Sequence, residues 1–219
     1  MAIDIGPQLR TVRMAQGKSL RSVAAAVGVS PSLLSQVENS KTSPSVSTLY
    51  ALVSYLGVSL DLLTSKLSQT PSEGGAKSDS VVQRRRDNLK LEMQNGVIWE
   101  RLADKASGLV DPLLVTYEPG AGSSLDGQVM THDAAEFGFL IEGSLTLSLD
   151  DELYELQAGD SFSFDANRKH RYMNNTLNVA RGVWFVLSHD KNASSNVPHS
   201  PAAPESAVEV LNMMKQSKK

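Results

Sequence analysis

The chain has 219 residues, 41% of them hydrophobic, and no cysteine, which is typical of a globular protein and excludes disulfide bonds, cysteine-based zinc sites and thiol nucleophiles. No apolar run reaches the roughly 18 residues that a membrane helix needs, and the amphipathic N-terminus lacks a signal-peptide core, so we expect a cytoplasmic protein with no membrane partner. The net charge of −3 divides into +3 for residues 1–70, +2 for 71–86, −10 for 87–190 and +2 for 191–219, which indicates a polyanion-binding front joined to an acidic domain.

Residues 5–67 show the pattern of several short helices. Apolar residues recur at helical spacing in two stretches, Leu20, Val23, Ala24, Val27 and Leu49, Leu52, Val53, Leu56. Ser19 and Ser30 are suited to cap the starts of two helices, and Pro31 suits the first helical position. Turn residues at 44–45 and 57–59 separate the last helices.

Residues 68–80 have the Ser, Gly and Pro content of a flexible linker. The basic run Arg84–Arg86 that follows is more typical of a solvated linker than of a DNA clamp. From there on, period-2 alternation broken by Gly, Asn and Asp predicts a β-sandwich or barrel. The predicted strands are 97–102, 112–119, 136–143, 145–151, 152–159, 160–165, 170–175 and 180–188.

Residues 20–37 carry the signals of a helix-turn-helix: a small residue in the first helix (Ala24), a glycine turn (Gly28), and an apolar stripe on the second helix (Leu34 and Val37). The stretch LRSVAAAVGVSPSLLSQVENSKTSPSVSTLYALVSYLGVSLDLL resembles the Cro and cI repressor family, also called the xenobiotic-response-element family, over about residues 5–67. The resemblance implies a five-helix bundle that binds double-stranded operator DNA.

Within that resemblance, the recognition helix runs from about Pro31 to Asn39 and lies in the major groove. Ser32 and Gln36 match base-reading positions, and glutamine can bond adenine at two points. Leu33 is a candidate for contact with a thymine methyl group. The positions that match phosphate contacts are Ser19, Asn39, Lys41 and Ser45.

Three observations qualify these roles. Pro31 stands where relatives often have a polar base reader, so the number of base contacts is open. The alternative for Gln36 is an ordinary solvent-facing helix residue. Arg13 and Glu38 match an internal salt bridge between the first and third helices of the family, and we assign them to structure.

Two motifs within residues 110–188 resemble the two signatures of the cupin family. The first reads Ser124, Met130-Thr131-His132, Glu136 and Gly143, and the second reads Gly159, Asp165-Ala166-Asn167, His170 and Asn174. Each keeps three of the five fixed residues, and fifteen residues separate them. The resemblance implies a small antiparallel β-barrel of jelly-roll type.

The spacing of these motifs predicts a polar pocket. Residues i and i+2 of a strand point the same way, so an inward His132 brings Met130 inward too. Glu136 is expected on the next strand and His170 on another hairpin. Two imidazoles and a carboxylate can hold a divalent metal such as Zn²⁺, Fe²⁺, Mn²⁺ or Ni²⁺. Met130 replaces the family's fourth ligand, and a thioether is a poor ligand for hard cations.

The alternative is a metal-free pocket in which the same three residues bond an effector directly. Tyr172 is added to the effector or metal pocket. The wall is expected to include some of the remaining large strand residues, although alternation leaves their direction open and most of them are expected to be plain core: Tyr117, Phe139, Leu140, Phe162 and Trp184.

These features predict a multidomain protein that is α and then β. The expected parts are a helix-turn-helix domain (1–67), a flexible linker (68–86), a cupin effector and dimerisation domain (87–190), and a disordered tail (191–219) in which 205–216 could form a short helix. The combination resembles regulators of small-molecule uptake or catabolism. The resemblance implies an effector-responsive repressor or dual regulator, and we therefore expect a homodimeric transcriptional regulator, in particular a repressor, that senses a small molecule such as an amino acid or amine and is not an enzyme. The alternatives are a metal-dependent cupin enzyme fused to a DNA-binding domain, and a regulator with a ligand-free dimerisation barrel.

Overall fold

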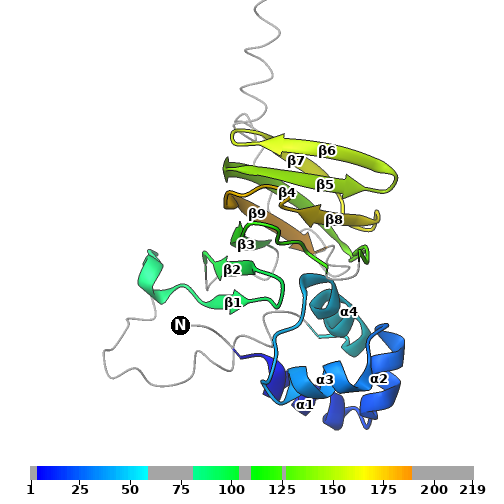
Figure 1. Cartoon of the computed structure of the whole chain (residues 1–219). Helices are drawn as coiled ribbons and strands as arrows, with labels where there is room; N and C mark the ends of the chain where they lie inside the picture. The colour runs from blue at the N-terminus through cyan, green and yellow to red at the C-terminus, as the bar shows by residue number, and fades with distance from the viewer. Residues whose placement is uncertain (1–3, 59–80, 104–109, 125–126, 189–219) are drawn as a thin grey trace, which may run out of the picture. The chain divides into compact units, whose positions relative to one another are not determined.

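The computed structural model describes residues 4–58, 81–103, 110–124 and 127–188 (Figure 1). The N-terminal part consists of helices α1 (Gly6–Ala15), α2 (Leu20–Ala26), α3 (Pro31–Glu38) and α4 (Val46–Leu56). A short 3-10 helix, η1 (Arg85–Asp87), precedes the strands β1 (Lys90–Glu92), β2 (Val97–Arg101), β3 (Val110–Tyr117), β4 (Ala134–Glu142), β5 (Ser144–Leu149), β6 (Glu152–Gln157), β7 (Ser161–Asp165), β8 (His170–Met173) and β9 (Ala180–Ser188). No helix in the described ranges is long and apolar enough to cross a membrane.

Serine residues cap the starts of α2, α3 and α4. The hydroxyls of Ser19, Ser30 and Ser45 each accept a hydrogen bond from the backbone N–H three residues later, at 3.0, 3.0 and 3.2 Å. Such a bond satisfies one of the N–H groups that a helix leaves unpaired at its start. The caps predicted at Ser19 and Ser30 are therefore confirmed, and the recognition helix begins at Pro31 as expected.

The helix-turn-helix is formed by α2 and α3. Gly28 lies in the turn between them with φ at +73°, a conformation that glycine adopts without steric cost. Ala24, Leu34 and Val37 are at most 1% exposed and form the core between the helices. The fifth helix implied by the family resemblance, the predicted linker over 68–80 and the predicted tail lie outside the described residues.

A partly buried ion pair joins α1 to α3. Arg13 Nε donates to Glu38 Oε1 at 2.6 Å and Arg13 Nη2 donates to Glu38 Oε2 at 2.7 Å, so the pairing is bidentate. Burial of Glu38 leaves its charge little access to water, and the guanidinium compensates for that loss. The pair is part of the helical core, as the family resemblance implies.

The strands form two antiparallel sheets. One has the order β1-β2-β3-β9-β4-β7 and the other the order β6-β5-β8 (Figure 1). Every strand predicted from the sequence is present, and β1 is an addition that its three residues were too few to reveal. The antiparallel sheets are confirmed, whereas closure into a barrel stays a prediction.

Strand β4 fixes which side chains face the interior between the sheets. Glu136 and Leu140 are buried, whereas Phe137 and Phe139 alternate with them and are 45% and 47% exposed. The expectation that Phe139 lines the pocket is therefore wrong, because the strand's phase directs it outward. Period-2 alternation separates the two faces of a strand but does not identify the inner one when both carry apolar residues.

Candidate functional site

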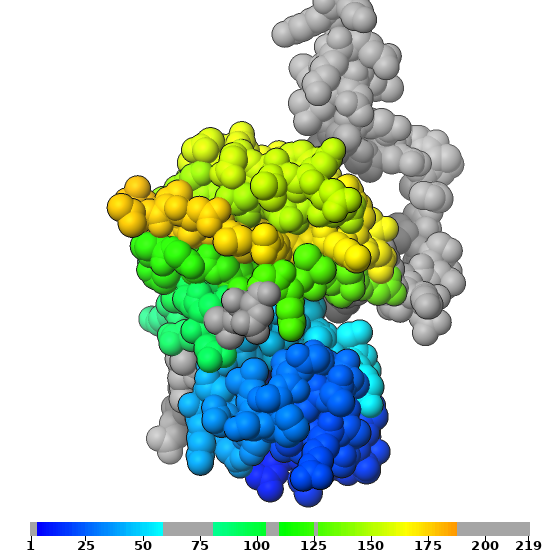
Figure 2. Space-filling view, turned by 45° about the vertical axis from the view of Figure 1, so that its right-hand side comes forward, coloured from blue at the N-terminus to red at the C-terminus, as the bar shows by residue number. Residues whose placement is uncertain are grey.

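Two residues predicted to read bases lie on the surface of α3. Ser32 and Gln36 are exposed and one helical turn apart on α3. Leu33 is half-buried and packs against the helical core, which limits what it can offer to a base. In the space-filling view the blue N-terminal helices form a convex surface that no later described segment covers on the side shown (Figure 2).

The residues matched to phosphate contacts divide into two groups. Ser19, Asn39 and Lys41 are exposed. Ser45 is only 3% exposed, and its hydroxyl bonds Ser47 and Thr48 within the first turn of α4. Its side chain serves the helix cap, so we leave it out of the proposed phosphate contacts.

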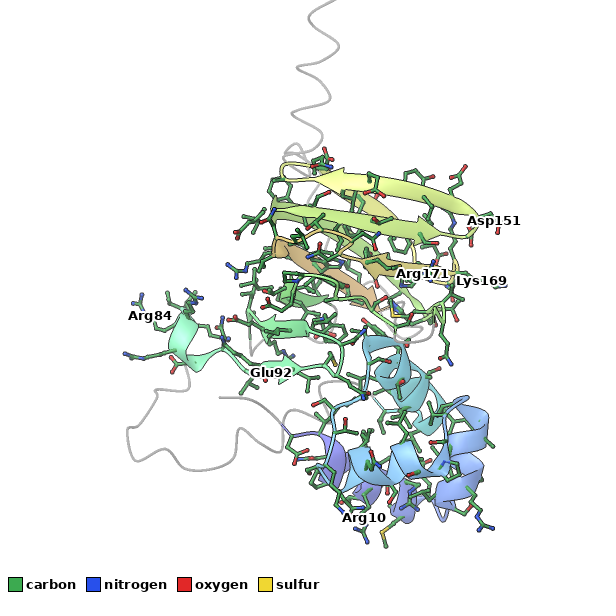
Figure 3. The ribbon with its side chains drawn as sticks, viewed as in Figure 1. Arg10, Arg84, Glu92, Asp151, Lys169 and Arg171 are labelled. Carbon is green, nitrogen blue, oxygen red and sulfur yellow. The ribbon has the colours of Figure 1, made fainter. Side chains whose placement is uncertain are left out.

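Arg10 is a basic residue of this surface that the sequence did not single out. It projects outward from α1 (Figure 3), and its Nη1 donates to Asn39 Oδ1 at 3.1 Å. The Asn39 side chain therefore lies beside a positive charge. A lone exposed arginine on α1 has no pattern that would have distinguished it from a solvated charge.

Three predicted pocket residues come together between the sheets. His132 precedes β4, Glu136 lies on β4, and His170 begins β8. The ligand atoms of the three residues all lie within 4.8 Å of one another. His132 Nε2 is 2.7 Å from Glu136 Oε1, and His170 Nε2 is 3.5 Å from the same oxygen.

The chain segments that carry His132 and Glu136 differ from those expected. His132 lies outside the named strands, and Glu136 follows it in the same segment rather than on a further strand. Met130 is buried, as expected, but it forms only an isolated bridge with His170. His132 therefore lies in the short segment between this bridge and the start of β4.

His170 is held with one ring nitrogen facing Glu136. Its Nδ1 is 2.9 Å from the Arg168 carbonyl oxygen and donates to it, so a neutral ring carries its lone pair on Nε2. That buried Nε2 has no hydrogen-bond partner in the described residues and faces a carboxylate oxygen. Two acceptors that face each other require a proton or a metal cation between them, and this arrangement fits a metal site.

The carboxyl group of Glu136 is kept ionised. Its burial alone would raise its pKa, but the neighbouring imidazoles of His132 and His170 outweigh that effect and lower the pKa to about 2. The hydroxyl of Tyr172 also donates to Glu136 Oε2 at 2.7 Å. The cluster therefore offers a permanent negative charge flanked by two imidazoles, which suits a cation or a hydrogen-bonding ligand.

A small cavity adjoins the carboxylate. Its volume is about 20 Å³, and Met130, Glu136 and Tyr172 are among its walls. Tyr117 and Trp184 line it as predicted, whereas Leu140 and Phe162 pack in the core outside it. The sequence did not predict the remaining lining residues, which are Val46, Tyr50, Trp99, Leu113, Val115 and Val186.

The comparisons with known proteins match both parts of the chain. A helix-turn-helix model matches residues 9–63, and a cupin domain model matches residues 113–186. The HTH-type transcriptional regulator PuuR of Escherichia coli is 28% identical over 178 residues, which cover 80% of this chain and 90% of PuuR. The HTH-type transcriptional regulator SutR of the same organism is 26% identical over 184 residues, with 80% and 89% covered.

A solved structure has the same fold over most of the chain. The crystal structure of an HTH_3 family transcriptional regulator from Vibrio cholerae superposes with a TM-score of 0.59 at 22% identity. The match covers 84% of this chain and 94% of that one. Both curated relatives above are transcriptional regulators.

Proposed function

We propose that the chain is a sequence-specific transcriptional repressor whose cupin domain senses a small molecule. The premise is that it has a Cro/cI-type helix-turn-helix domain followed by a cupin domain and is homologous to the regulators PuuR and SutR. The observation that carries the proposal is the exposed side chain of Gln36 on the recognition helix α3, in the same chain as a buried polar pocket. We assign DNA binding to residues 1–67, a linker to 68–86, and sensing and dimerisation to 87–190.

The proposed DNA contacts fall into two classes. Ser32 and Gln36 read base edges, with Leu33 at their margin, and these contacts supply sequence specificity. Ser19, Asn39, Lys41 and the additional Arg10 contact phosphates, and these contacts set affinity and register. The two classes predict different responses to substitution.

Replacing Lys41 with alanine should weaken binding to all DNA sequences alike. The substitution removes one phosphate contact and the counterion release that accompanies it, so the salt dependence of log K should become shallower by about one unit. Fluorescence anisotropy titrations at several salt concentrations measure both effects. An unchanged salt slope, or a loss confined to the operator, would remove Lys41 from the phosphate contacts.

We propose that the protein acts as a two-fold dimer joined through its cupin domain. The outer face of the six-stranded sheet carries an apolar patch of Phe137, Phe139 and Ile141 from β4 and Phe185 from β9, each at least 42% exposed. Phe137 lies opposite Phe185 across the strands, and a groove of about 330 Å³ runs over the aromatic rings. A contiguous apolar surface of this kind marks an interaction site. A second copy of the chain is the occupant that brings two recognition helices to one operator.

The double variant Phe137→Glu and Phe139→Glu should turn the dimer into a monomer at micromolar concentration. Two-fold symmetry places four added negative charges in one interface, and like charges brought together there cost several kcal/mol. Light scattering during size-exclusion chromatography measures the mass. Leu153→Glu is the matched control, because this side chain is 69% exposed on β6 of the other sheet. A double variant that stays dimeric would exclude the patch as the interface.

The sensing site is proposed at His132, Glu136 and His170, with Met130 and Tyr172 completing it. The unpaired Nε2 of His170 and the ionised carboxylate of Glu136 fit a divalent metal such as Zn²⁺, Fe²⁺, Mn²⁺ or Ni²⁺ with open positions for an effector. When bound, such a metal would supply a Lewis-acidic anchor for a carboxylate of the effector. Without a metal, the acidic pocket favours an effector with an amine, such as an amino acid or polyamine.

Native mass spectrometry of protein purified without added metal, together with metal analysis, tests this site. We expect a dimer that carries a metal or a small molecule at its cupin domains. An apo dimer that binds no divalent metal on titration would limit the site to direct contacts with the effector. Turnover of a candidate substrate by metal-loaded protein would instead support an enzyme, the alternative from another class.

A further inference from the structure

Tyr50, on helix α4 of the DNA-binding domain, reaches the cupin pocket. Its ring stacks on the ring of His132 with centroids 4.1 Å apart and planes 1° from parallel. It also meets Trp99 edge-on at 5.7 Å. Tyr50 is 8% exposed and is one of the walls of the cavity beside Glu136. A residue of the helix-turn-helix domain is therefore part of the pocket that is proposed to sense the effector.

Backbone hydrogen bonds hold α4 in this position. The N–H of Ser47, in the first turn of α4, donates to the Ser123 carbonyl oxygen at 2.9 Å. This bond satisfies one of the donors that a helix leaves unpaired at its start. On the approach to α4, the Pro44 carbonyl oxygen accepts from the Gln94 N–H at 3.1 Å.

The anchor of α4 connects directly to the pocket. The Ser123 N–H donates to the Tyr172 carbonyl oxygen at 2.9 Å, and the Ser123 hydroxyl accepts from the Tyr172 N–H at 3.0 Å. The side chain of Tyr172 in turn donates to Glu136. Ser123 thus joins the start of α4 to β8, the strand that carries the pocket residue Tyr172.

The space that remains in the pocket is too small for an organic effector. A cavity of about 20 Å³ holds roughly one water molecule, whereas pockets for small molecules are on the order of 300 Å³ or more. The ring of Tyr50 lines this cavity and covers one face of the His132 ring.

We propose that Tyr50 fills the effector subsite from the DNA-binding domain, so that the effector and α4 compete for the face of His132. This inference rests on the proposed function and names its regulation. Because Leu49, Leu52 and Leu56 of α4 are buried in the helical core, the helix-turn-helix moves with Tyr50. The docked form fixes the two recognition helices of a dimer relative to each other and is the form that binds the operator; the effector releases them.

The first test removes the Tyr50 ring by substitution and supplies the same ring as a free small molecule. The variant Tyr50→Ala is titrated with 4-methylphenol, which is the tyrosine side chain without its backbone, and binding is followed by calorimetry. We expect Tyr50→Ala to bind this probe at roughly millimolar concentration or below and the wild type to show no binding. Tyr55→Ala is the matched control: it removes the same side chain from the same helix, where that ring contacts Lys18 and not the pocket.

The second test measures coupling at the operator. Tyr50→Ala and His132→Ala remove opposite partners of the stack, and each should weaken operator binding about two- to tenfold. The double variant should lose little more than either single one, since the partners act together. His132→Ala leaves the DNA-binding domain unaltered, so its effect cannot come from damage to the helix-turn-helix.

These outcomes separate the inference from the proposed function. A wild-type protein that binds no DNA specifically overturns the proposed function. A wild type that binds its operator, together with a folded Tyr50→Ala that takes up no 4-methylphenol, overturns the inference alone. If Tyr50→Ala does not unfold cooperatively, Tyr50→Leu replaces it, because leucine keeps an apolar side chain for packing but removes the ring. This variant is also expected to bind 4-methylphenol.

Discussion

Gln36→Ala is expected to weaken operator binding by about 1–3 kcal/mol, roughly fivefold to 150-fold, and to relax the sequence preference at the base pairs that Gln36 reads. The reason is that Gln36 is exposed on α3 and its amide can bond adenine at two points, so the alanine variant leaves those base atoms without a partner. Affinity for nonspecific DNA should change little, because a base contact is absent there.

Anisotropy titrations against the operator and against operators altered at single base pairs measure this effect. Ser54→Ala, an exposed position on α4 away from the recognition helix, is the control. A Gln36 variant with unchanged affinity and unchanged preference would leave Gln36 as a solvent-facing helix residue and would shift base reading to Ser32.

The second large effect is expected at the pocket. Glu136→Gln and His170→Ala should each abolish the effector response while the operator affinity of the effector-free protein stays within about threefold of wild type. Each substitution removes one of three converging ligand groups, and metal affinity should fall by roughly a hundredfold or more. Glutamine keeps the size of the side chain and its ability to accept from Tyr172 but removes the charge that a cation needs.

The control is Glu142→Gln, the same substitution on the same strand, where the side chain is 58% exposed and faces Arg181. The measurement is operator titration with and without candidate effectors, together with Ni²⁺ or Mn²⁺ titration followed by calorimetry. Folded Glu136 and His170 variants that still respond fully would show that this cluster is not the sensing site.

Local patterns were sufficient for most of the fold. The caps at Ser19 and Ser30, the glycine turn at Gly28 and the alternation of the strands depend on neighbours within a few residues, and each is present as predicted. The cluster of His132, Glu136 and His170 could also be predicted from the resemblance to the two cupin motifs, although His132 and Glu136 lie in one segment and not on two strands as expected.

The sequence was less informative where the same local pattern fits two directions or two roles of a side chain. Phe139 alternates with Leu140 between the two faces of β4, and only the packing of the second sheet decides which one points inward. Ser45 matches a phosphate-contacting position of the Cro and cI repressor family that the sequence resembles, yet its hydroxyl is buried in the cap of α4. For Phe139 the tertiary environment decides the role, whereas the cap formed by Ser45 is a local feature that the sequence analysis did not assign.

Tyr50 illustrates the limit most clearly. Its spacing along α4 is that of an ordinary core residue, and nothing nearby in sequence indicates a partner at His132. The stack depends on how the helices dock against the sheets, and hydrogen bonds such as that from Ser47 to Ser123 fix that docking. A contact between two domains has no local signature of the kind that a cap or a turn has.

The most direct test of the central claim is selection of binding sites from random duplex DNA by the full-length protein. The account predicts enrichment of a near-palindrome whose half-sites lie about one helical turn apart, since two recognition helices related by two-fold symmetry must reach the same face of the duplex. Enrichment should be lost with Gln36→Ala. Recovery of no enriched sequence, or of a single asymmetric site, would contradict a dimeric sequence-specific regulator.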